Sequence, residues 1–235
     1  MHKHVMPQWA IDRAMERRGR LHPFADLNPR TTALIVVDLQ NGFMIEDVAV
    51  AYVPSAVEIV PNVNRLAAAV RATGGKVFWI KNTMDEPSLS SWSHYHAIAT
   101  PQARRNRVAN MSPGTRGHEL HGALDVRPED TIVQKYRFSA FIQGASELPQ
   151  LLRAQGVDTV LITGTVTNVC CESSARDAMM LNFRTIMVSD GNAAMSDEEH
   201  NATLASFYAI FGDVMDTDML IECLDRNAAQ MRAAE

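Results

Sequence analysis

The chain has 235 residues, enough to bury the core of one large α/β domain without disulfides or structural metals. Its net charge of −5 and pI near 5.9 argue against general nucleic-acid binding, which normally needs a basic surplus, and favour a small-molecule substrate. No apolar run approaches the ~18 residues of a membrane span and the polar N-terminus lacks a signal-peptide core, so we expect no membrane partner.

The cysteines indicate the compartment. There are three cysteines, two of them adjacent in the sequence. An odd number of cysteines with an adjacent pair does not form a disulfide framework. Such usage suits a reducing cytosol, so we predict a cytoplasmic protein.

Residues 1–30 differ from the rest of the chain. They are rich in Arg and His, and a short amphipathic helix is expected from Ala10 to Arg18, ended by Gly19. Because the charge run is short and broken, we interpret this segment as an arm lying on its own domain or on a neighbouring subunit, rather than as a basic partner-binding tail. Residues 31–235 are then expected to form a single domain.

The first core strand is predicted from Ala33 to Val37, a continuous apolar run that ends at Asp38. In open α/β sheets ligands collect beyond the carboxyl ends of the strands, which makes Asp38 a candidate for chemistry. The alternative is a carboxylate that only caps the following turn. A helix over 61–72 and a strand over 76–81 are expected next.

Residues 82–113 form a long polar connection carrying Trp92, His94, Tyr95 and His96. Long connections in compact domains are usually functional or disordered. Two histidines one residue apart can bind a metal, but surface or pocket-lining positions are commoner, and we predict no metal site. We expect the connection to shape the substrate pocket or a subunit contact.

A third buried strand is predicted from Thr131 to Val133, with Lys135 just beyond its end, as Asp38 lies beyond the first. A lysine there is most often solvated. Phe138 and Phe141 nearby suggest instead an apolar wall that would hold an ammonium close to its partners.

A strand, a turn and a helix are predicted from 158 to 177. Thr159 to Ile162 is rich in β-branched residues, Gly164 is expected to end the strand, and helical spacing begins at Cys170. The positive end of a helix dipole stabilises a thiolate and can bind an oxyanion. If Cys170 faces the crevice, Cys171, turned about 100° around the helix, faces the packing layer. The alternative is that both are inert buried residues.

The remaining chain continues the alternation of helices and strands. It predicts a doubly wound three-layer α/β/α sandwich on a mainly parallel sheet, since no repeat or internal linker interrupts it. The further elements expected are helices over 148–155, 197–211 and 219–224 and strands over 184–188 and 212–215.

Three stretches, in order, resemble the isochorismatase-like cysteine hydrolases. They lie at 33–43 (ALIVVDLQNGF), 134–141 (QKYRFSAF) and 164–170 (GTVTNVC), and the resemblance covers about 31–224. It implies a six-stranded sheet, a homodimer or homotetramer, no cofactor and a catalytic triad of Asp38, Lys135 and Cys170. It also implies a cis peptide between Thr165 and Val166 and an oxyanion hole of the Val166 and Cys170 amides.

The chemistry implied is hydrolysis of a C–N bond through a thioester. Asp38 would take the proton of Cys170, Lys135 would hold the thiolate, and ammonia or an amine would leave before water releases the acid. True isochorismatases lack the cysteine that this chain has. Nicotinamidases carry metal-binding residues, an Asp-x-His and further histidines, just after the second strand, whereas this chain has the stretch Asn82-Thr83-Met84-Asp85 there. The resemblance is therefore best to the ureidoacrylate and N-carbamoylsarcosine amidohydrolases, which act on small amide or ureido substrates. Candidate substrate-binding residues are Gln40, Phe43, Asn82, Phe138 and Phe141.

Two other readings remain open from the residues. Met and Phe around the motifs are also compatible with a hydrolase of bulkier hydrophobic or xenobiotic amides. A thiol redox sensor or binding module would use the Cys170-Cys171 pair and would need neither Asp38 nor Lys135.

Overall fold

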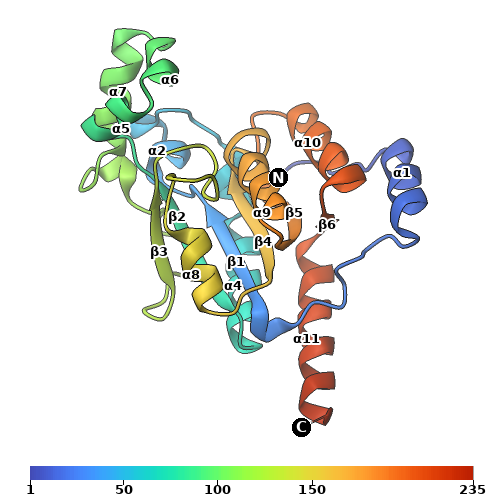
Figure 1. Cartoon of the computed structure of the whole chain (residues 1–235). Coiled ribbons are helices and arrows are strands. Elements are labelled where there is room, and N and C mark those ends of the chain that lie inside the picture. Colours follow the sequence, from blue (N-terminus) through green and yellow to red (C-terminus); the bar gives the residue numbers. More distant parts are fainter. Residues whose placement is uncertain (235) are drawn as a thin grey trace.

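The structure is a computed structural model and describes residues 1–234. Its centre is a six-stranded sheet in which every pair of neighbours is parallel, in the order β3-β2-β1-β4-β5-β6 (Figure 1). The predicted α/β class and doubly wound parallel sheet are confirmed. The strands are β1 (Thr32–Val37), β2 (Lys76–Asn82), β3 (Thr131–Lys135), β4 (Thr159–Thr165), β5 (Arg184–Ala193) and β6 (Asp213–Met215).

The strand order has a reversal at its centre. The chain builds outward from β1 through β2 to β3, then returns with β4 on the other side of β1 and continues outward to β6. At such a switch point the connections leave in opposite directions, and a crevice opens beyond the carboxyl ends of the strands. β1 and β4 therefore define where a ligand site is expected.

Helices cover both faces of the sheet (Figure 1). One face carries α1 (Gln8–Arg18), α8 (Leu148–Ala154), α9 (Glu172–Met180) and α10 (Asp197–Ile210), and the other carries α3 (Ser55–Glu58), α4 (Val60–Ala72) and α11 (Thr217–Ala234). Alternate residues of β1 serve the two cores: Ile35 and Val37 pack in the first, Leu34 and Val36 in the second. Burial on both faces explains why β1 reads as a continuous apolar run. The sequence predicts a buried third strand, but β3 lies at the edge of the sheet and its Ile132 is exposed.

The long connection after β2 is not an irregular loop. It folds into α5 (Glu86–Ser91), α6 (Ser93–Ala97) and α7 (Pro101–Met111), which stand above the carboxyl edge of the sheet (Figure 1). Asp85 accepts a hydrogen bond from the Ser88 N–H, and Thr100 accepts one from the Ala103 N–H, so each side chain caps a helix start. The remaining short elements are η1 (Pro29–Thr31), α2 (Asn41–Met44), η2 (Glu46–Val48) and η3 (Arg116–His118).

Four predicted boundaries are wrong. The strand expected over 184–188 continues to Ala193 as β5. Gly164 does not end its strand, because β4 continues through it to Thr165 alongside β5. Lys135 is not beyond β3 but is its last residue, paired with Asn82. The closing helix is 18 residues long rather than six, because buried positions recur past Leu224 to Ala228.

The N-terminal segment lies against the same chain. α1 packs on α10 (Figure 1), Arg18 Nη1 donates to the Gly212 carbonyl at 2.9 Å, and the Val5 N–H donates to Asn201 Oδ1 at 2.8 Å. These contacts fit the expected arm. Within residues 1–234, none of the helices has the length and apolarity needed to cross a bilayer.

Candidate active site

Asp38 lies directly after β1, at the switch point. Its backbone has a φ of +56°, a left-handed conformation that Asp tolerates better than most residues. The Asp38 N–H donates to the Ile80 carbonyl at 3.0 Å, and the Asp38 carbonyl accepts from the Gln40 N–H at 2.8 Å. These bonds hold the residue at the strand end with its side chain fully buried.

Lys135 reaches Asp38 from two strands away. Its side chain is fully buried, and Nζ lies 2.8 Å from Asp38 Oδ2, 3.0 Å from the Arg137 carbonyl oxygen and 3.6 Å from Cys170 Sγ. The ammonium thus contacts both other members of the predicted triad. The structure brings the three residues together.

The tightly packed end of β4 and the turn after it position Cys170. Gly164 has a φ of +119°, and a Cβ there would lie 1.9 Å from the Val37 carbonyl oxygen, so only glycine fits beside β1. The Thr165–Val166 peptide is cis, as the resemblance implies. A π-helical turn (η4, Thr167–Cys171) follows and leads into α9, which places Cys170 in the last turn before that helix.

The two adjacent cysteines have different surroundings. Cys170 lines a cavity, whereas Cys171 is fully buried and its thiol lies 3.9 Å from the Thr163 carbonyl oxygen. The predicted difference in facing is therefore confirmed.

Burial and charge pairing together decide the ionisation of the triad. Burial raises the pKa of the Asp38 carboxyl above its ordinary value, although the Lys135 ammonium opposes this. Burial alone would lower the pKa of Lys135, but the nearby Asp38 and Cys170 raise it. Burial also raises the pKa of the Cys170 thiol well above its usual range, with Lys135 acting in the opposite direction. Burial thus favours the neutral thiol of Cys170, and the two partners of Lys135 favour its charged form.

The cavity in front of Cys170 has a volume of about 220 Å³. Of the predicted site residues, Phe43, Asn82, Phe138, Val166 and Cys170 line it. It is lined in addition by residues from other parts of the chain: Val50, Ala51, Met84, Tyr95, Arg107, Asn168, Val169, Met195 and Glu199.

Two predicted substrate-binding residues lie outside this lining. The Gln40 amide is fully buried, donates to the carbonyls of Asn82 at 3.1 Å and His118 at 3.0 Å, and accepts from the Asn82 N–H at 2.7 Å. Gln40 therefore ties the end of β1 to the end of β2. Phe141 points into the core, where its ring packs edge-to-face on Phe183 with centroids 5.8 Å apart. Both side chains are thus engaged in internal packing and hydrogen bonding rather than in the lining of the cavity.

Sequence reasoning missed the charged residues of the cavity, Arg107 and Glu199. Arg107 lies on α7, whose polar sequence shows no motif, and only the unusual length of the 82–113 connection hinted that α7 belongs to the site. Glu199 lies in the first turn of α10, where an acidic residue is expected for the helix dipole alone. Tyr95 and Trp92 from the same connection stack with centroids 4.1 Å apart, and both pack edge-to-face on Phe138. The connection thus forms an aromatic wall of the cavity.

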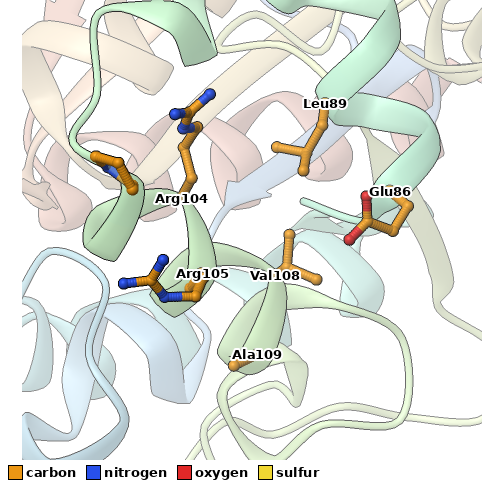
Figure 2. A pocket seen from close by; sticks show the side chains of 7 residues that line it. Glu86, Leu89, Arg104, Arg105, Val108 and Ala109 are labelled. Carbon is orange, nitrogen blue, oxygen red and sulfur yellow. The ribbon is translucent and has the colours of Figure 1, made fainter.

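A larger hollow, about 440 Å³, lies between α5 and α7, and Figure 2 shows its lining. Its walls are charged and aliphatic side chains, including Glu86, Leu89, Arg104 and Arg105. It has no nucleophile in its lining, so the Cys170 cavity is the better candidate for chemistry.

The two histidines of the connection lie in different surroundings. His96 is buried and packs against Trp92 and Tyr95, while His94 is exposed. Within residues 1–234, no three His, Cys, Asp or Glu side chains lie together in a way that could hold a metal ion.

The fold and the site define a class of protein, and comparison with known proteins agrees. Residues 32–219 match the isochorismatase domain, and the chain belongs to that family. It is 35% identical over 213 residues to the ureidoacrylate amidohydrolase RutB of Methylobacterium radiotolerans, covering 84% of this chain and 81% of that protein.

Solved structures share the fold. A cysteine hydrolase from Pseudomonas syringae pv. phaseolicola has a TM-score of 0.77 and 29% identity, covering 86% of this chain and 96% of that one. An N-carbamoylsarcosine amidase from Thermoplasma acidophilum has a TM-score of 0.62 and 25% identity, covering 80% of this chain and 97% of that one.

Proposed function

We propose that this protein is a cysteine amidohydrolase that cleaves a C–N bond of a small ureido or amide substrate through a thioester. The contact of Lys135 with both Asp38 and Cys170, together with the place of Cys170 in the cavity lining, carries the proposal. A thiol redox sensor would need neither contact. The names of the relatives, a ureidoacrylate amidohydrolase and an N-carbamoylsarcosine amidase, support the C–N bond as the target.

The first half of the reaction forms the thioester. A neutral buried thiol is a poor nucleophile, so Asp38 accepts the Cys170 proton as sulfur attacks the substrate carbonyl, and the Lys135 ammonium stabilises the developing thiolate. The backbone amides of Val166 and Cys170 are proposed to receive the oxyanion, a contact worth about 3 kcal/mol. The leaving nitrogen takes the proton from Asp38 and departs as ammonia or an amine.

The second half consumes water. Asp38, now ionised again, accepts a proton from a water molecule that attacks the thioester carbonyl, and Cys170 leaves and is reprotonated. The products are the acid, or carbamate, and the leaving amine. Every proton is moved by the triad, so the scheme needs no cofactor.

The cavity favours a small substrate. Its volume of about 220 Å³ is below the range of about 300–1,000 Å³ that is typical for drug-sized ligands. A bulky xenobiotic amide would have to displace the aromatic wall, so we prefer an amide or ureido compound of few atoms. Asn82, which lines the cavity, is proposed to hydrogen-bond the ureido or amide group.

The test is release of ammonia or amine from a panel of ureidoacrylate, N-carbamoyl amino acids, nicotinamide and simple aliphatic and aryl amides. We expect release to be abolished in Cys170→Ala and retained in the matched control Cys171→Ala, whose thiol lies outside the cavity lining. Loss in Cys171→Ala alone would contradict the assigned nucleophile. Hydrolysis of only bulky apolar amides would refute the small-substrate assignment.

We also propose a homodimer or homotetramer acting in the cytoplasm. All three cysteines are free and buried, which suits a reducing compartment. Light scattering of the purified protein measures the assembly, and a monomeric mass would contradict this part of the proposal.

A further inference from the structure

One cavity-lining cation is not used by the proposed chemistry. Arg107, on α7, enters the lining of the same cavity as Cys170. Its guanidinium carbon lies 4.8 Å from the centroid of the Tyr95 ring, a cation–π contact. Nη1 is buried and has no hydrogen-bond partner among residues 1–234.

A buried guanidinium nitrogen without an acceptor is unusual, because Arg stays charged and an unsatisfied charged donor is costly. Such a group needs an explanation, and a water molecule, an ion or a ligand can supply the acceptor. Because Arg107 lines the Cys170 cavity, a molecule that enters this cavity can bring that acceptor to Nη1.

Within residues 1–234, the other charged groups in and around the cavity do not pair with Arg107, so its charge can be neutralised by an anion. Lys135 is already paired with Asp38. Glu199, the carboxylate in the lining, contacts Ser196 Oγ at 3.3 Å, and no ion pair joins it to Arg107 in the part of the chain described. Most of the remaining wall is apolar: Phe43, Val50, Ala51, Met84, Phe138, Val166, Val169 and Met195.

We propose that Arg107 binds a carboxylate carried by the substrate, so that the preferred substrates are ureido or amide acids. The inference rests on the proposed function, since it places the scissile carbonyl at Cys170 and the acid group of the same molecule at Arg107. A planar carboxylate matches the forked donors of a guanidinium, and in an apolar cavity this pairing discriminates against neutral analogues.

The experiment compares a matched pair of substrates, N-carbamoyl-β-alanine and its neutral carboxamide, together with ureidoacrylate. In Arg107→Met we expect kcat/KM for both acids to fall about 30-fold or more, through KM, while the value for the carboxamide changes less than about threefold. Arg107→Lys should recover part of the loss. Arg105→Met is the control, since Arg105 lies on the same helix but is exposed and outside this cavity.

A second readout does not need turnover. The rates at which iodoacetate and iodoacetamide alkylate Cys170 are followed by mass spectrometry of the peptide. We expect Arg107→Met to slow iodoacetate relative to iodoacetamide, and Arg105→Met to leave the ratio unchanged. An unchanged ratio in Arg107→Met would overturn the inference.

The experiments distinguish a failure of the proposed function from a failure of the inference about Arg107. If the wild type hydrolyses acids and carboxamides equally and Arg107→Met changes neither, the proposed function stands and the role of Arg107 is refuted. If the wild type hydrolyses no ureido or amide compound, the proposed function fails, and the alkylation ratio still decides whether Arg107 attracts a carboxylate.

Discussion

Replacing Lys135 by Met should destabilise the protein in a strongly pH-dependent way. Met keeps much of the side-chain volume but removes the ammonium that lies 2.8 Å from Asp38 Oδ2. Both side chains are fully buried, so the carboxylate loses its counter-charge where water cannot replace it. Its folded-state pKa, already raised by burial, must rise further.

The magnitude follows from that additional rise. A close opposite charge shifts a carboxyl pKa by about 1–3 units, and each unit corresponds to 1.36 kcal/mol, which gives a loss of up to about 4 kcal/mol. Measured losses on breaking buried pairs are about 3–5 kcal/mol. Because the folded pKa of Asp38 in the variant exceeds its unfolded value, the folded state prefers the protonated acid. Stability is therefore retained at low pH and lost as the pH rises through the folded pKa.

The assay is urea unfolding of wild type and Lys135→Met at pH 5 and pH 8. We expect the difference in the free energy of unfolding to be about 3–4 kcal/mol at pH 8 and to shrink at pH 5. The double variant Asp38→Asn/Lys135→Met removes both charges and should be more stable than Lys135→Met at pH 8. Equal losses at the two pH values, or losses that simply add in the double variant, would refute the reasoning.

Two further predictions concern the backbone at the switch point and the base. Gly164→Ala should lower the free energy of unfolding by several kcal/mol, because the new Cβ would lie 1.9 Å from the Val37 carbonyl oxygen and the residue has a φ of +119°. Thermal unfolding measures this loss. The control is Gly144→Ala, because Gly144 is exposed, also has a positive φ, and has open space around its Cβ position. The value of kcat/KM should fall as the pH drops through the pKa of Asp38, because only the ionised carboxylate accepts the thiol proton. The midpoint of this fall should lie above pH 3.8, the ordinary pKa of an aspartate, because burial raises the pKa of Asp38. A rate that is flat down to pH 4 would contradict the assignment of Asp38 as the base.

Much of the fold could be predicted from local sequence. The central strands β1 and β4 are buried on both faces and therefore read as apolar runs. Helices α4, α8, α9 and α10 show helical spacing or clear stop residues. Their boundaries were less predictable, because pairing with a neighbour, not local preference, extends β4 past Gly164 and β3 to Lys135. The three helices of the 82–113 connection were missed for a related reason: their sequences are polar, and the α7 helix has little apolar periodicity.

The sequence by itself determined the candidates: Asp38 and Lys135 at the ends of strands, and Cys170 in the turn that leads from a strand into a helix. Only the tertiary structure decided that β4 returns beside β1, which brings a carboxylate and a thiol separated by more than a hundred residues to one lysine. It also decided that Gln40 serves the backbone while Arg107 enters the cavity. The local sequence pattern indicates which face of a helix or strand is buried. Contacts between elements that are distant in the sequence depend on how the whole chain folds, and no short stretch of sequence determines this.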